Sequence, residues 1–141
     1  MAENREMQKK ILSYRFLEAR LEAVLKQREM LASKLIEMQT TIQSIDEIEK
    51  GEEILFPIGS GAHAFGKISE NGKIIVEIGG NVALEKTMEE GKKILEERME
   101  EIEKSLNAIQ GNIAELSSNM DRLGAEIQEL GKGMKGTPEA G

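Results

Sequence analysis

Few side chains in this sequence could carry out acid–base, nucleophilic or metal chemistry, and they do not cluster. His63 is the only histidine, and the chain has no cysteine. A catalytic base or a metal ligand needs partner groups at a defined spacing, and His63 has no second histidine or thiolate beside it. His63 is therefore read as a cross-strand or surface residue, and the sequence predicts no enzyme, no metal site and no cofactor.

Two other stretches resemble functional motifs in composition alone. The Gly59-Ser60-Gly61 stretch lacks the Gly-x-x-x-x-Gly-Lys pattern of a phosphate-binding loop, so a hairpin turn is the better interpretation. A run of glutamates could suggest calcium, but the alternating aspartates and central glycine of a calcium-binding loop are missing. A solvated helix face is the better interpretation of these residues, which are Glu96, Glu97, Glu100, Glu101 and Glu103.

The first segment of the chain repeats apolar and aromatic residues at the 3–4 spacing of a coiled-coil seam. They occupy positions 7, 14, 21, 35 and 42 and positions 17, 24, 31, 38 and 45, and only Arg28 interrupts the series. This pattern predicts a coiled-coil helix over 1–50. It ends at Gly51, because glycine is favoured just after a helix.

The last segment shows a second seam, which runs from Met88 to Met134 and is interrupted only by Lys92. Thr87 followed by Glu90 forms a capping box, which marks the start of a coiled-coil helix predicted over 87–131. Glycines and a proline predict a flexible tail over 132–141. Since each seam must be buried, the two helices are expected to pair as a long antiparallel hairpin in one domain, mainly α with a small β region.

Three glycines fall off the seam of the second helix, namely Gly91, Gly111 and Gly124. A glycine in a helix interior costs up to about 1 kcal/mol relative to alanine. Two interpretations stay open: glycines tolerated on the surface, which we favour, or glycines that let the helix bend.

The middle segment, 51–86, reads as two β-hairpins. Strand-like runs at 53–58, 62–69, 73–78 and 82–86 are separated by glycine-rich turns, and Asn71-Gly72 is a strong signal for a two-residue hairpin turn. Small sheets need an apolar partner, and the strands of other subunits are the expected cover. The residues expected to make this assembly surface are Ile54, Phe56, Ile58, Phe65, Ile74, Val76, Ile78, Val82 and Leu84.

Apolar residues off the seam gather near the N-terminus. Leu12 and Phe16 are four residues apart on the face turned away from an antiparallel partner, and Ile11 lies beside them. An exposed apolar cluster at the open end of a hairpin is a candidate binding surface. Leu130 and Met134 are expected nearby; for Met7 and Met134 a seam role and a binding role stay equally open.

The distribution of charge and apolar residues argues against nucleic acids and membranes as partners. The net charge is −7, with nine basic and nine acidic residues in 1–50 but six basic and twelve acidic residues in 85–131. A nucleic-acid-binding chain would show a basic stripe, and these sums indicate none. No apolar run approaches the roughly 20 residues of a membrane span. The polar N-terminal region also predicts no signal peptide, so a cytoplasmic location away from membranes is expected.

Two long helices joined by two consecutive hairpins make the chain resemble the α-class subunit of the prefoldin family, as found in archaea. The matching stretches are ILFPIGSGAHAFGKI, 54–68, and KIIVEIGGNVALEKTMEEG, 73–91. Within them Leu55–Gly61, Ile78–Asn81 and Glu85–Thr87 correspond to the family's strand entry, its glycine turn and its run into the second helix. Two hairpins, rather than one, distinguish the α class from the β class.

The resemblance implies an ATP-independent chaperone, or holdase. Two α-class and four β-class subunits would form a hexamer with an inter-subunit β-barrel body, capture unfolded polypeptides at the tips of coiled-coil arms and pass them to a group II chaperonin. The implied client-binding residues are Met7, Ile11, Leu12, Phe16, Ile127, Leu130 and Met134. Two alternatives remain: a homopolymeric prefoldin-like filament former, and a structural coiled-coil spacer without clients.

Overall fold

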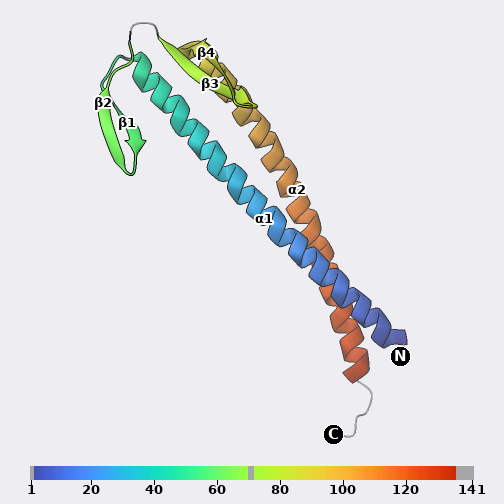
Figure 1. The fold of residues 1–141 in the computed structure, drawn as a ribbon. Helices are drawn as coiled ribbons and strands as arrows, with labels where there is room; N and C mark the ends of the chain where they lie inside the picture. Colours follow the sequence, from blue (N-terminus) through green and yellow to red (C-terminus); the bar gives the residue numbers. More distant parts are fainter. Residues whose placement is uncertain (1, 70–71, 136–141) are drawn as a thin grey trace. The chain divides into compact units, whose positions relative to one another are not determined.

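The computed structural model describes residues 2–69 and 72–135 of the chain, with the side chains of residues 134 and 135 outside the description. Helix α1 (Ala2–Glu49) is followed by strands β1 (Ile54–Gly59), β2 (Ala62–Gly66), β3 (Lys73–Gly79) and β4 (Val82–Thr87), and then by helix α2 (Met88–Lys135) (Figure 1). The predicted fold class, two long helices with two small antiparallel hairpins between them, is confirmed.

The described chain forms two compact parts. The terminal part consists of residues 2–31 and 105–135, and the hairpin part consists of residues 32–104. In the terminal part α1 runs antiparallel to α2, since Met7 lies beside Gly131, Lys10 pairs with Glu126 at 3.1 Å, and Tyr14 lies beside Gly124. Its most buried side chains are Ile109 and Leu116, both at predicted seam positions of α2. Arg28, the predicted interruption of the α1 seam, is exposed.

Local sequence signals set the inner ends of both helices. Gly51 adopts a φ of +73° and its N–H donates to the carbonyl oxygen of Ile48 at 3.0 Å, which closes the last turn of α1 as predicted. At the start of α2 the N–H of Glu90 donates to Thr87 Oγ1 at 3.1 Å, and the N–H of Thr87 donates to Glu90 Oε1 at 3.2 Å. The predicted capping box is confirmed, whereas α2 continues to Lys135, past the expected boundary at Gly131.

Loss of the capping box is expected to have a measurable and pH-dependent effect. Hydrogen bonds from Thr87 lower the pKa of Glu90 below its ordinary value of 4.5. Its stabilising contribution is therefore present above pH 4.5 and is lost as the pH falls through the lowered pKa. Thr87→Ala should cost about 1 kcal/mol of unfolding free energy at pH 7. The melting temperatures of the wild type and Glu90→Gln should converge below pH 4.5, as the pH falls through the lowered pKa. Thr40→Ala, inside α1, should keep or raise the melting temperature at every pH because alanine is the better helix former.

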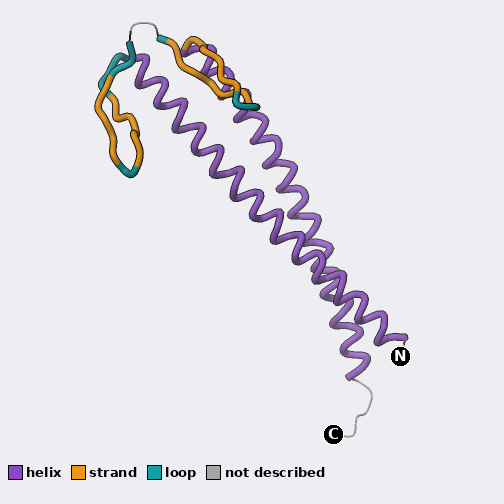
Figure 2. The backbone as a smooth tube through the Cα atoms, in the orientation of Figure 1, coloured by secondary structure: helices purple, strands orange, loops and turns teal. Residues whose placement is uncertain are grey.

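Each hairpin is closed by a two-residue turn with left-handed backbone (Figure 2). Ser60 and Gly61 have φ of +51° and +78°, and Gly80 and Asn81 have φ of +57° and +61°. Two consecutive positive φ values are the signature of a type I′ turn, whose twist matches that of the flanking strands. Both hairpins shift register just before the turn, between Pro57 and Gly59 and between Glu77 and Gly79.

The connection between the hairpins differs from the prediction. Among the described strands, β2 pairs with β1 and β3 pairs with β4, so the Asn71-Gly72 signal does not mark a hairpin turn between β2 and β3. Asn71 lies outside the described residues, whereas Gly72 has a φ of +57° and its N–H donates to the carbonyl oxygen of Ser69 at 3.2 Å. The glycine has the left-handed backbone that the pair favours, but the signal for a two-residue hairpin turn is wrong here. The predicted division into two hairpins on either side of the pair is confirmed.

The second hairpin packs on α2 through a glycine. Gly91 is buried, and a Cβ atom there would overlap the side chain of Ile74. Val76, 7% exposed, lies beside the same glycine, and Arg98 donates to the carbonyl oxygen of Glu77 at 2.8 Å. The expectation of a surface glycine at 91 is therefore wrong, because helix contacts with a distant strand are not visible in the helix periodicity.

Lys92, the predicted interruption of the α2 seam, has carboxylate partners. Its Nζ atom lies 3.0 Å from Asp46 Oδ1 and 3.1 Å from Glu49 Oε1, at the end of α1. The hydrogen bond to Asp46, and next the one to Glu49, raise the pKa of Lys92 above its ordinary value. An ammonium group thus replaces an apolar seam contact at this point of the hairpin part.

Candidate functional site

The terminal part exposes two large apolar side chains side by side. Leu12 and Phe16 are each 65% exposed and lie one helical turn apart on α1. They face away from α2, as their positions off the seam predict. Exposing two large apolar groups together is unfavourable unless something covers them, so this pair is the first candidate for a binding surface.

The other residues of the predicted binding surface lie on the packing side of the helices. Met7, Ile11, Ile127 and Leu130 are all half-buried. Met134 is in α2, but its side chain lies outside the described residues. The predicted surface therefore divides into an exposed pair on the outside of α1 and a half-buried group that contributes to helix packing.

A hollow of about 340 Å³ lies beside the half-buried group. It is lined by Ile11, Tyr14, Arg15, Glu18, Gly124 and Ile127. Gly124 creates this space, because its missing side chain leaves room beside the Tyr14 ring, whose Cε2 atom would be 3.7 Å from a Cβ at that position. Its lining includes Ile11 and Ile127 of the predicted binding surface but neither Leu12 nor Phe16.

An ion pair links the two helices beside this hollow. Lys10 Nζ lies 3.1 Å from Glu126 Oε2 and 3.6 Å from Glu6 Oε1. The hydrogen bond with Glu126 is the main cause of the raised pKa of Lys10. This ion pair is partly exposed and adds little to stability, so apolar packing sets most of the helix register beneath the exposed pair.

The hairpins form the second candidate surface, and the structure divides the predicted assembly residues by face. Val76 is buried within the chain, and Ile54, Phe56 and Ile74 are half-buried. Val76 and Ile74 pack on the chain's own α2. The predicted residues that remain exposed are Ile58, Phe65, Ile78, Val82 and Leu84.

Two exposed hairpin residues were not predicted. Leu55 is 55% exposed and is the cross-strand partner of Phe65, which is 74% exposed, while Ile75 is 75% exposed. The prediction chose one apolar face for each strand and omitted these residues. The signal that could have found them is the uninterrupted runs Ile54-Leu55-Phe56 and Ile74-Ile75-Val76, since strands covered on both faces are continuously apolar.

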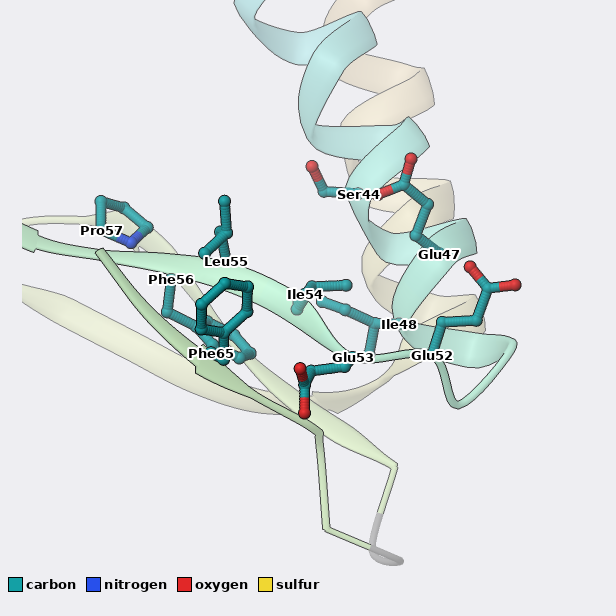
Figure 3. A pocket seen from close by; sticks show the side chains of 10 residues that line it. All are labelled: Ser44, Glu47, Ile48, Glu52, Glu53, Ile54, Leu55, Phe56, Pro57 and Phe65. Atoms are coloured by element: carbon teal, nitrogen blue, oxygen red, sulfur yellow. The ribbon is translucent and has the colours of Figure 1, made fainter. Parts of the chain in front are cut away.

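A second hollow lies beside the first hairpin, with a volume of about 670 Å³ (Figure 3). Its lining comes from the end of α1, from the connection to β1, and from the hairpin itself. Five apolar residues of the hairpin line it, and so do three carboxylates; these are Ile54, Leu55, Phe56, Pro57 and Phe65, and Glu47, Glu52 and Glu53. The exposed pair of Leu55 and Phe65 thus belongs to the lining of this hollow, and both are open to contact with a partner.

No metal-binding chemistry accompanies these surfaces. Within residues 2–69 and 72–135, no three His, Cys, Asp or Glu side chains are grouped so that they could hold a metal ion. None of the described helices is long and apolar enough to cross a membrane.

Comparison with known proteins identifies the family. The model of the family described as "Prefoldin subunit" matches residues 14–133. A protein named "Prefoldin subunit alpha" from Methanothrix thermoacetophila is 32% identical over 88 residues, which cover 60% of this chain and 58% of that protein. Its namesake from Pyrococcus horikoshii is 30% identical over 96 residues, which cover 65% of each chain. The chain therefore spans less than two thirds of the length of these curated relatives.

Solved structures share the fold at lower identity. The cryo-EM structure of filamentous PFD from Methanocaldococcus jannaschii matches with a TM-score of 0.68 and 22% identity over 84% of this chain and 98% of that one. The crystal structure of the prefoldin beta subunit from Thermococcus strain KS-1 matches with a TM-score of 0.61 and 17% identity, over 88% of this chain and 90% of that one. The chain belongs to the prefoldin subunit family, which confirms the resemblance to its α class seen in the sequence.

Proposed function

We propose that this chain is the α-class subunit of an ATP-independent chaperone that holds unfolded polypeptides and prevents their aggregation. The observation that carries the proposal is the exposed Leu12–Phe16 pair in a chain of this family. Unfolded polypeptides expose scattered apolar groups without a fixed shape. An exposed apolar pair on each of several arms would gain affinity by multivalency while every single contact stays weak. Release then needs no nucleotide.

The hairpins are the proposed assembly surface. A two-stranded sheet is marginal on its own, and Leu55, Phe65 and Ile75 remain exposed in the isolated chain. Strands of partner subunits would cover them and close an inter-subunit barrel. We assign the partners to the β class, in a hexamer of two α-class and four β-class subunits. This hexamer would work in the cytoplasm and hand its clients to a group II chaperonin.

Solution mass measured by light scattering tests this assignment. The chain is measured alone and after mixing with a single-hairpin β-class subunit. A small species that becomes a discrete hexamer on mixing supports the proposal. Long heterogeneous polymers from the chain alone would instead favour a filament former, in keeping with the filamentous state named for the structural relative. A stable dimer indifferent to the β-class subunit would favour a spacer.

Charge on the exposed hairpin pair should block assembly. In Leu55→Glu/Phe65→Glu two carboxylates replace a cross-strand apolar pair, and a partner strand would have to bury both without counter-charges. We expect no hexamer at concentrations where the wild type assembles fully. Lys67→Glu, an exposed change next to the same hairpin, should still assemble. A hexamer of normal mass from the double variant would place the interface elsewhere.

A further inference from the structure

The outward face of α1 carries a longer apolar row than the exposed pair alone. In the terminal part, Met30 is 73% exposed, and Ala19 and Ala23 are exposed as well. An α-helix turns by about 100° per residue, so positions 12, 16, 19, 23 and 30 fall within an arc of about 60°. The row is about 27 Å long at 1.5 Å per residue. It lies opposite the seam residues Tyr14, Leu17 and Leu21, which are half-buried.

The spacing of this row is that of a helix-packing seam. The steps of four, three and four residues from Leu12 to Ala23 are those by which a helix accepts a second helix along its length. Two alanines occupy its centre, and small side chains allow a partner helix to approach closely. Large side chains at both ends, Leu12 with Phe16 and Met30, would flank such a partner.

Positive charge borders the row. Five cations fall within about 70° of its centre, and the nearest carboxylate, that of Glu22, is about 90° away. The cations are Arg5, Lys9, Arg15, Arg20 and Lys26. Glu22 is 3.9 Å from Lys26. In the described part of the chain the other four cations form no ion pair. The balanced total of residues 1–50 conceals this basic face, so the sequence-based conclusion that no basic stripe exists is corrected.

We propose that this face, residues 5–30 of α1, binds an acidic amphipathic helix of a partner protein, with the partner's apolar side on the alanines and its carboxylates beside the flanking cations. Complementary charge selects the occupant, because a basic helix would be repelled by the same five cations that attract an acidic one. The proposal deepens the holdase function, and rests on it, since Leu12 and Phe16 belong to both surfaces.

Fluorescence anisotropy with two synthetic peptides tests the proposal. Both peptides are about 18 residues long and helical, with leucines along one side, and they differ only in bearing glutamates or lysines beside the leucines. The full-length chain, assembled with its β-class partner, should bind the acidic peptide at least about tenfold more tightly than the basic one. Raising NaCl from about 0.05 to about 0.5 M should remove most of that preference.

Ala23→Glu places a carboxylate in the middle of the row without changing Leu12 or Phe16. We expect about tenfold weaker binding of the acidic peptide, because the new carboxylate would be buried against an acidic partner. The matched control is Ala108→Glu, an exposed change on α2 in the same part, which should bind as the wild type does. Far-UV circular dichroism checks that both variants stay helical.

The outcomes separate this proposal from the holdase function. Equal binding of the two peptides, or unchanged binding by Ala23→Glu, would overturn the acidic-helix proposal while aggregation suppression by the wild type still supports the holdase. A labelled single-stranded DNA of about 20 nucleotides that binds more tightly than the acidic peptide would also overturn it, in favour of a nucleic acid. If the wild type does not suppress aggregation at all, the holdase function on which the proposal rests is overturned.

Discussion

Replacing Leu12 and Phe16 together with serine is expected to remove most of the chain's ability to suppress aggregation. Each side chain is 65% exposed and free to be covered by an apolar group, which is favourable by up to about 1.5–3 kcal/mol per fully buried side chain. Losing both should weaken each client contact by more than tenfold, since about 1.4 kcal/mol corresponds to a factor of ten. Turbidity of a denatured test protein, followed at increasing concentrations of the assembled chaperone, measures the loss.

The matched control is Ile36→Ser, because Ile36 is also a largely exposed apolar residue of α1 but lies in the hairpin part. It should suppress aggregation as the wild type does. Assembly of the double variant with the β-class subunit should be unchanged, since the hairpins are untouched. Full suppression by the double variant would mean that the exposed pair is not the client-binding surface, and the structural spacer would become the better description.

The second large effect is expected at Gly91. A leucine there would collide with Ile74 and displace the second hairpin from α2. Overpacking of this kind typically costs about 1–3 kcal/mol. This exceeds the gain of about 1 kcal/mol from replacing glycine with a better helix former. Urea unfolding followed by circular dichroism should therefore show a lower midpoint for Gly91→Leu.

Two comparisons tie the effect of Gly91→Leu to the contact. A Cβ atom at Gly111 would meet no packing neighbour within 4 Å, so Gly111→Leu should keep or raise the unfolding midpoint. Shortening the colliding residue should relieve the strain, so Ile74→Ala should cost less stability in the Gly91→Leu background than in the wild type. Additive effects of the two changes would argue that Gly91 and Ile74 do not meet.

The helices could be predicted because their signals are local and repeated. Each seam has many positions that agree, and the capping box of Thr87 and Glu90 forms as its four-residue pattern indicates. The single exceptions to each seam also have physical reasons. Arg28 is exposed to solvent, and the charged Lys92 side chain forms ion pairs with two carboxylates. In a helix, residues three or four apart in the sequence lie on the same face, so the spacing that produces the apolar pattern also produces the side-chain contacts.

The errors arise where distant segments decide the outcome. Asn71-Gly72 has the composition of a hairpin turn, but strand pairing depends on β1 and β4, which lie on either side of both candidate strands. Gly91 is off the helix seam because its contact is with β3 rather than with α1. The row along α1 is a different case: summing charge by segment, and not by helix face, finds it only at Leu12 and Phe16, although the predicted helix already arranges its alanines and cations.

The turns and register shifts of the two hairpins match, so the two hairpins differ chiefly in their side chains. Adding twenty to the residue numbers 54–66 gives 74–86. With this offset the register shifts, the left-handed turns and the strand pairs of the two hairpins correspond. The exposed cross-strand pair is Leu55 with Phe65 in one hairpin and Ile75 with Glu85 in the other. The same backbone register thus presents an apolar cross-strand pair in the first hairpin and a pair with one carboxylate in the second.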